Sequence, residues 1–294
     1  MTKPLMGVTL PQFGSDPDAF VDGARRAEAL GFDSVWAFDH LWPLTGGKQR
    51  PIFEAWTSLP YLAEATERIG IGTLVTRSSL RHPALLAKAI ATTALIAPGR
   101  LTVAIGSGDD MSRAENDAFG VPYWEADKRG AQLISTVQAV RSFLTADEVT
   151  QSDDFVSLSS LPPSPRPSQP VPLWIAGRSE DAIEAAALVA DGWNGWGGTP
   201  KTFARDAASV IERAEGRPIE PTWGGQVAIG ADDGEVAEKM KTRDPKQFVT
   251  GTPQQVGERL AGFAEAGASH IILTTPDSSD PHIFELLARA REQL

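Results

Sequence analysis

Short apolar runs follow glycines at intervals along the chain. Helical stretches end at Gly31, Gly70, Gly99, Gly192 and Gly267, and an apolar run begins within a residue or two of each. Glycine supplies the left-handed conformation just past a helix, and runs that are apolar on both faces are typical of buried parallel strands. The sequence therefore predicts eight strands, at residues 5–10, 33–38, 71–75, 101–106, 172–177, 192–196, 224–230 and 270–275.

Helical patterns lie between the predicted strands. Eight β/α units in a chain of 294 residues favour a closed (β/α)8 TIM barrel, an α/β fold, over an open doubly wound sheet. We expect a single domain, residues 1–294, with two insertions near the mouth of the barrel: 107–124 after strand four and 145–171 before strand five. The predicted helices cover residues 17–30, 53–69, 83–97, 125–144, 180–190, 200–215, 253–266 and 281–293.

Charge and cysteine content exclude several classes of protein. The chain has 27 Lys and Arg against 38 Asp and Glu, a net charge of -11, and no basic run interrupts this balance, so we expect no nucleic-acid partner. It has no cysteine, which excludes disulfides and thiolate ligands. No window approaches about 18 uninterrupted apolar residues, so we expect no membrane span and a cytoplasmic location.

Chemically active side chains are densest after the second predicted strand, in the segment FDHLW. Barrel active sites gather at the carboxyl ends of the strands, which places Asp39, His40 and Trp42 at the mouth. His40 can give or take a proton near neutral pH, with Asp39 or Asp109 available to set its charge and tautomer. Trp42 can lean on a flat ring or an apolar substrate. The alternative is a loop histidine that only caps a strand end.

Two glycine-containing turns are candidate ligand loops. Gly106 and Gly108 flank Ser107 after strand four, so backbone amides there can approach a planar or anionic ligand. The segment fails as a dinucleotide fingerprint, because Met111 stands where the third glycine belongs. The stretch AGRSEDA at 176–182 joins a strand end to a helix start, where amides and an arginine can hold phosphate. An ordinary tight turn and an ordinary capped helix explain the same two patterns.

Other barrel chemistries lack their residues. A Schiff-base enzyme needs a lysine at the mouth, and only Lys201 lies near a strand end. A metal hydrolase needs convergent histidines, yet no H-x-H occurs, so we expect no metal. Asp109 and Asp110 are adjacent and cannot readily flank a glycosidic bond from opposite faces. The remaining option is a bound organic cofactor that brings its own reactivity.

Four blocks of sequence carry a family resemblance that covers nearly the whole chain. They are FDHLW, EAWTSLPYLAEATERIGIGTLVT, HPALLAKAIATTALIAPGRLTVAIGSGD and WIAGRSEDAIEAAALVADGWN. In this order they resemble the bacterial luciferase-like family, and specifically its branch that depends on the deazaflavin coenzyme F420. The resemblance implies a (β/α)8 barrel with insertions, a cofactor bound in the mouth, hydride transfer to or from a small-molecule substrate, and a homodimer.

The resemblance also assigns roles to individual residues. It implies that His40 handles a proton or stabilises charge beside the cofactor ring, with Asp39 as its partner in the motif. It implies a cis peptide bond between Leu74 and Val75, in a bulge behind the ring. The cofactor-binding residues implied are Asp39, Leu74, Val75, Thr76, Gly106, Ser107, Gly108, Ala176, Gly177 and Arg178, the last three as the phosphate loop, with Trp42 near the pocket.

The chain departs from the sugar-phosphate dehydrogenases of that branch. They carry Glu where this chain has Asp109, a candidate second acid, and only Lys201 matches their phosphate-binding basic residues. We therefore expect a more hydrophobic substrate than a sugar phosphate. Two alternatives stay open: an FMN-dependent monooxygenase of the same family that uses O2, and a barrel that binds cofactor without catalysis.

Overall fold

A closed barrel of parallel strands forms the centre of the molecule. The computed structural model describes residues 3–43 and 47–294. Eight strands pair side by side in the order β9, β11, β1, β2, β3, β4, β7 and β8, and β8 pairs back with β9 to close the ring. The predicted barrel and its eight strands are confirmed. The strands are β1 Leu5–Thr9, β2 Ser34–Ala37, β3 Gly70–Arg77, β4 Leu101–Gly106, β7 Leu173–Ala176, β8 Gly192–Trp196, β9 Glu220–Ile229 and β11 His270–Thr274.

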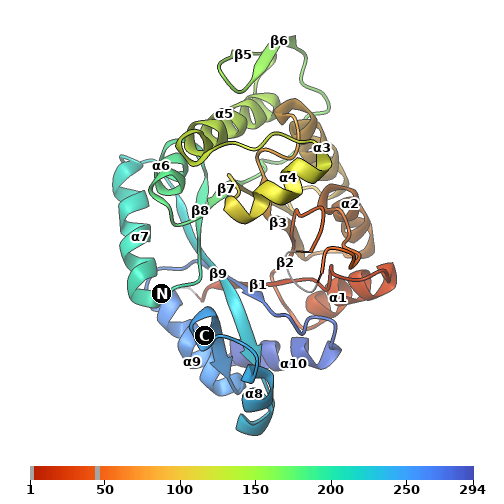
Figure 1. The fold of residues 1–294 in the computed structure, drawn as a ribbon, viewed down its shortest axis with the longest axis vertical. Coiled ribbons are helices and arrows are strands. Elements are labelled where there is room, and N and C mark those ends of the chain that lie inside the picture. The colour runs from red at the N-terminus through yellow and green to blue at the C-terminus, as the bar shows by residue number, and fades with distance from the viewer. Residues whose placement is uncertain (1–2, 44–46) are drawn as a thin grey trace.

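Helices surround the barrel as an outer ring (Figure 1). Several begin with an acidic or threonine cap followed by proline, as at Asp16 before α1 and Asp280 before α10, because a capping oxygen satisfies a free amide and proline needs no partner. Among the described residues, α4 and α8 were not predicted. The α-helices are α1 Pro17–Ala29, α2 Ala55–Ala65, α3 Pro83–Ile96, α4 Arg113–Phe119, α5 Ala126–Thr145, α6 Glu180–Val189, α7 Pro200–Arg213, α8 Asp233–Met240, α9 Pro253–Glu265 and α10 Pro281–Ala290.

Smaller elements decorate this ring. The strand β10, Phe248–Gly251, pairs in parallel with the carboxyl half of β9. The short helices η1 Asp110–Ser112, η2 Pro245–Gln247 and η3 Arg291–Gln293 precede or follow longer elements. The strands β5, Val149–Ser152, and β6, Ser157–Leu161, form an antiparallel hairpin.

The second insertion does not lie at the mouth, contrary to our expectation. The β5–β6 hairpin lies beyond α5 on the outside of the ring (Figure 1), where Ser135 of α5 donates to Asp153 at 2.8 Å. The chain then returns to Leu173, the amino end of β7. Helix α5 runs back from the mouth, so the segment that follows it starts at the opposite end of the barrel.

Two indole side chains fill part of the barrel interior. Trp36 and Trp174 stack with their ring centroids 5.3 Å apart, and His270 meets both rings edge-on. Glycines on neighbouring strands make room, since a Cβ on Gly72 would lie 2.6 Å from Trp36 and one on Gly192 would lie 2.5 Å from Trp174. The interior cluster consists of Trp36, Leu74, Ala104, Trp174 and Ile272, with Val75 and Ala176 packed against it.

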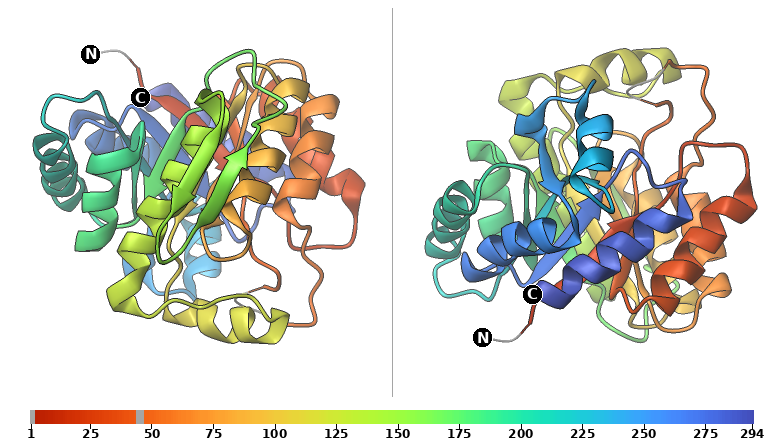
Figure 2. Two further views of the ribbon diagram at one scale, coloured as in Figure 1. Left: turned by 90° about the horizontal axis from the view of Figure 1, so that it is seen from above. Right: turned by 90° about the horizontal axis from the view of Figure 1, so that it is seen from below.

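Helix α4 marks the end of the barrel that carries the candidate residues. Both views of Figure 2 place it at the end opposite to the C-terminus, across the carboxyl ends of the strands. The first insertion therefore lies at the mouth, as predicted. No helix within residues 3–43 and 47–294 combines the length and the apolar character needed to cross a bilayer.

Candidate functional site

His40 leaves the carboxyl end of β2 and meets a carboxylate from α4. Its Nδ1 lies 3.0 Å from Oε2 of Glu115, and the His40 side chain keeps 19% of its surface exposed while Glu115 keeps none. The other oxygen of Glu115 accepts the backbone amides of Leu41 and Trp42. The partner of His40 is thus Glu115, whereas the sequence pointed to Asp39 or Asp109.

Arg77 at the end of β3 completes this cluster. Its Nη2 lies 2.9 Å from Oε2 of Glu115, an ion pair without hydrogen-bond geometry, and its Nη1 donates to Asn116 at 2.8 Å. Burial on its own raises the pKa of Glu115, but the hydrogen bonds from His40 and Leu41 and the charges of His40 and Arg77 bring it below its ordinary value. Glu115 is therefore ionised near neutral pH.

Asp39 has a different partner. Both of its oxygens accept from Arg81, at 2.5 and 2.9 Å, and Arg81 also pairs with Glu54. The Asp39 side chain is fully buried, and burial raises the pKa of its carboxyl above the ordinary value, with Arg81 opposing that shift only in part. The carboxylate ties the loop after β2 to the loop after β3, and within the described residues no hydrogen bond joins it to His40.

The end of β3 carries the irregular backbone that the resemblance implied. The peptide bond between Leu74 and Val75 is cis, and the register with β4 shifts between Thr73 and Thr76. A Cβ on Gly106 of β4 would lie 2.8 Å from Val75, so this glycine accommodates the bulge. The hydroxyl of Thr76 accepts from the Trp56 indole at 3.0 Å and thus faces α2.

The turn after β4 is shaped by its glycine and by an acidic cap. Gly108 has a φ of 77°, in the left-handed region. Asp109 caps η1, because its Oδ1 accepts the amide of Ser112 at 3.1 Å and its hydroxyl at 3.0 Å. Ser107 is half-buried, and its hydroxyl reaches only the carbonyl of Gly108, at 3.3 Å. Asp109 is exposed, and its capping bonds account for one carboxylate oxygen.

The turn after β7 presents an arginine at a helix start. Ala176 and Gly177 are half-buried, and Gly177 has a φ of 138°. Arg178 donates through Nε to the buried Asp206 at 2.8 Å and keeps 30% of its side chain exposed. Ser179 caps α6 directly after it. Positive charge and the amides of a helix N-terminus suit an anionic ligand.

Two buried polar groups near the carboxyl ends of β8 and β11 lack partners within the described chain. Oδ1 of Asn194 and Oγ1 of Thr274 are both inaccessible, although the Asn194 amide nitrogen donates to Thr222 at 2.9 Å. Buried polar atoms are nearly always hydrogen-bonded, so a polar ligand or water is the expected partner. The half-buried Val75 and Ala176 pack against the interior cluster.

Trp42 stands at the rim of the mouth. Phe119 of α4 meets its ring edge-on, with centroids 6.2 Å apart, and the ammonium of Lys48 lies 3.9 Å from the indole centroid. The ring is half-buried. These contacts hold the indole beside the loop that carries His40, where it can form one side of a substrate pocket.

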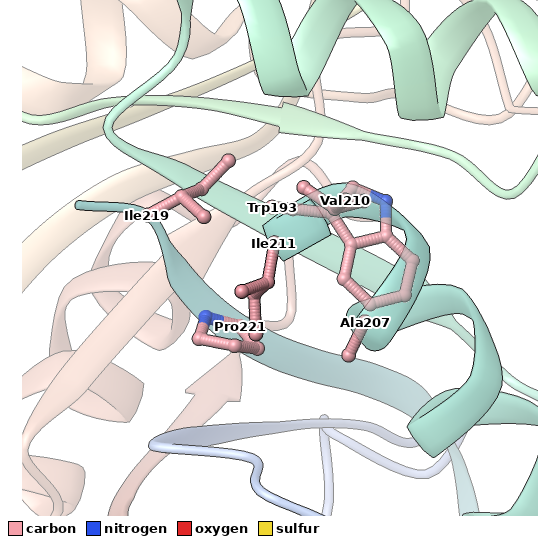
Figure 3. A pocket seen from close by; sticks show the side chains of 6 residues that line it. All are labelled: Trp193, Ala207, Val210, Ile211, Ile219 and Pro221. Atoms are coloured by element: carbon pink, nitrogen blue, oxygen red, sulfur yellow. The ribbon is translucent and has the colours of Figure 1, made fainter. Parts of the chain in front are cut away.

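Two hollows lie away from the carboxyl ends. An apolar crevice between α7 and the strands β8 and β9, lined by Trp193 and Ile219 among others, is too small to hold a water molecule (Figure 3). A groove of about 410 Å³ runs beside residues 167–173, where Arg141 pairs with Asp191 at 3.0 Å. Neither contains a candidate residue.

Comparison with known proteins settles the family. The model of the family described as luciferase-like monooxygenase matches residues 5–249. The chain belongs to this family. Among its relatives, an F420-dependent glucose-6-phosphate dehydrogenase of Beutenbergia cavernae is 28% identical over 91% of this chain and 92% of its own. An F420-dependent hydroxymycolic acid dehydrogenase of Mycobacterium tuberculosis is 30% identical over 64% of this chain and 51% of its own.

Solved structures agree on the fold. An F420-dependent secondary alcohol dehydrogenase, in complex with an F420-acetone adduct, superposes with a TM-score of 0.85 at 21% identity, over 98% of this chain and 99% of its own. An EDTA monooxygenase of Chelativorans sp. BNC1 superposes with a TM-score of 0.84 at 15% identity, over 99% of this chain and 94% of its own. The sugar-phosphate dehydrogenases among the relatives argue against our expectation of a substrate other than a sugar phosphate.

Proposed function

We propose that this protein is an F420-dependent oxidoreductase that moves a hydride between the deazaflavin and a small organic alcohol or its carbonyl form. The observation that carries the proposal is the placement of His40, held by a buried carboxylate at the mouth of the barrel with part of its ring exposed. The relatives named as F420-dependent glucose-6-phosphate and hydroxymycolic acid dehydrogenases support the same cofactor and the oxidation of a hydroxyl-bearing carbon.

The residues around the mouth fit the cofactor. Val75 and Ala176 would lie under the deazaflavin ring. The backbone of Gly106, Ser107 and Gly108 would approach the cofactor closely. Arg178 and the start of α6 would hold the anionic tail of the cofactor. When bound, F420 supplies a carbon that gives or takes a hydride. Leu74 and Thr76 would contact the cofactor through the backbone of the bulge rather than through their side chains, since Leu74 packs in the interior cluster and Thr76 faces Trp56.

The chain itself handles the proton. His40 would take the hydroxyl proton of an alcohol as its carbon is oxidised, or return it during reduction. Asp39 would fix the loop that carries His40 through its bonds to Arg81, and Trp42 would bound the substrate on one side. Asp109 remains a candidate second acid, although one of its oxygens caps η1.

Titration of the purified apo-protein with F420 and with FMN, followed by fluorescence, tests the cofactor. We expect tight binding of F420 and weak binding of FMN. Tight binding of FMN alone would overturn the proposal in favour of the monooxygenase alternative. Glucose 6-phosphate and simple secondary alcohols, tested separately with F420, would then decide whether the substrate carries a phosphate.

His40→Ala tests the proton role. We expect F420 affinity to change little and turnover to fall about 100-fold or more, the usual loss when acid-base help is removed. His282→Ala is a matched control, because His282 is exposed and its Nδ1 pairs with Glu285 on its own helix. Unchanged turnover in His40→Ala would remove His40 from the mechanism.

A further inference from the structure

We infer that Glu115 is a positioning residue that fixes the tautomer of His40, so that Nδ1 carries the proton and Nε2 is free to accept one from the substrate. This inference rests on the proposed function only where it concerns turnover. It assigns a task to the first insertion, whose helix α4 crosses the mouth (Figure 2).

The donors around Glu115 determine the tautomer. An ionised carboxylate only accepts hydrogen bonds. Its Oε1 accepts from the amides of Leu41 and Trp42, and its Oε2 faces Nδ1 of His40 at 3.0 Å. Nδ1 must therefore be the donor, which leaves the lone pair of a neutral imidazole on Nε2. A general base at Nε2 needs that arrangement.

The carboxylate is itself held in place. Asn116, the next residue, accepts from Arg77 at 2.8 Å and donates to Ser79 at 3.1 Å, which anchors the start of α4 to the loop after β3. Glu115 is fully buried, so water does not compete for its oxygens. A carboxylate that is itself held in place restricts the orientation of its hydrogen-bond partner more than a mobile surface carboxylate does.

The charges near His40 come from three elements. Glu115 on α4 lies against the ring, and Arg77 on β3 lies against the same carboxylate oxygen. Asp39, the preceding residue, is paired with Arg81. Among the described residues, Glu115 is the carboxylate in contact with the imidazole, so its removal should change the tautomer of His40.

Glu115→Gln reverses the donor pattern without changing the shape of the side chain. The two backbone amides keep the carbonyl oxygen of the glutamine on their side, which turns its NH2 group toward His40. That group donates to Nδ1, so the ring proton moves to Nε2 and the base is lost. The corresponding carboxylate-to-amide change in the serine-protease triad acts through the same wrong tautomer.

Nitrogen NMR of histidine-labelled apo-protein reads the tautomer directly and needs no cofactor. We expect the Nδ1–H form of His40 in the wild type and the Nε2–H form in Glu115→Gln. With F420 and substrate, kcat/KM should fall about 100-fold or more, with F420 affinity little changed. Glu125→Gln, an exposed carboxylate paired with Arg113, should behave as the wild type.

Several outcomes would overturn the inference. They are an Nε2–H tautomer in the wild type, an unchanged tautomer in Glu115→Gln, or unchanged kcat/KM in that variant. If Glu115→Gln does not fold, Glu115→Asp keeps the charge and should keep the Nδ1–H tautomer; an Nε2–H form there would also refute it. If Glu115→Gln retains turnover while His40→Ala loses it, this inference fails and the proposed function stands.

Discussion

His270 gives the fold a dependence on pH that can be calculated from its environment. The ring lies among Trp36 and Trp174, is 5% exposed, and meets the Ser34 hydroxyl at 2.8 Å. Burial lowers the pKa of His270 from 6.5 to about 4, against the opposing charge of Asp33. We therefore expect the folded protein to hold this imidazole neutral at pH values where the unfolded chain protonates it.

The sign follows from proton binding. Between the two pKa values the unfolded chain binds the extra proton, so the free energy of unfolding falls as the pH drops below 6.5 and the loss is complete below about 4. One pKa unit corresponds to about 1.4 kcal/mol, so the full effect is about 3 kcal/mol. Lowering the pH from about 7 to about 5 should remove about 2 kcal/mol of it.

Urea unfolding of the wild type and of His270→Gln at both pH values measures this contribution. The wild type should lose about 2 kcal/mol more than the variant between the two conditions, because the variant has no group to titrate at this position. His282→Gln, at an exposed position, serves as the control and should match the wild type. An equal loss in wild type and His270→Gln would refute the reasoning.

Two further substitutions test the packing that positions the site. Gly72→Ala forces a Cβ to within 2.6 Å of Trp36, so we expect a loss of about 1–3 kcal/mol in urea unfolding, whereas Gly14→Ala, which has open space around it, should cost little. Equal effects would count against tight packing. Asp39→Asn weakens the hydrogen bonds to Arg81 but leaves that arginine paired with Glu54, so stability should fall by about 1.5–3 kcal/mol; thermal unfolding unchanged from the wild type would argue otherwise.

Much of the fold could be predicted because its signals are local. Glycines at helix ends precede five of the predicted strands, short apolar runs mark the others, and the eight barrel strands lie where these signals occur. The strand β9 begins at Glu220 rather than at the predicted residue 224; its first residues include Pro221, which is unfavourable in a strand interior. The strand β10 was missed because four residues, FVTG, carry no periodicity.

The site could be predicted only as far as each residue is defined by its own strand. His40 lies three residues past the end of β2, close enough for its position in the sequence to place it at the mouth, and the cis bond at Leu74 came from the resemblance. Glu115 lies 75 residues from His40, in a short helix that our reading of the sequence did not predict. No local sequence pattern therefore joins the two residues. The homodimer stays a prediction, which light scattering would test.

The hydrogen bonds of Glu115 on α4 to the loop that carries His40 limit how this barrel can be redesigned or can diverge in evolution. Barrel enzymes are usually thought to change specificity by exchanging one βα loop at a time on a constant scaffold. Here the loop after β2 and the segment after β4 share one carboxylate, which also bonds two amides of the first loop. A graft of either segment alone would separate the imidazole from its support, so the two segments have to be transplanted as a unit.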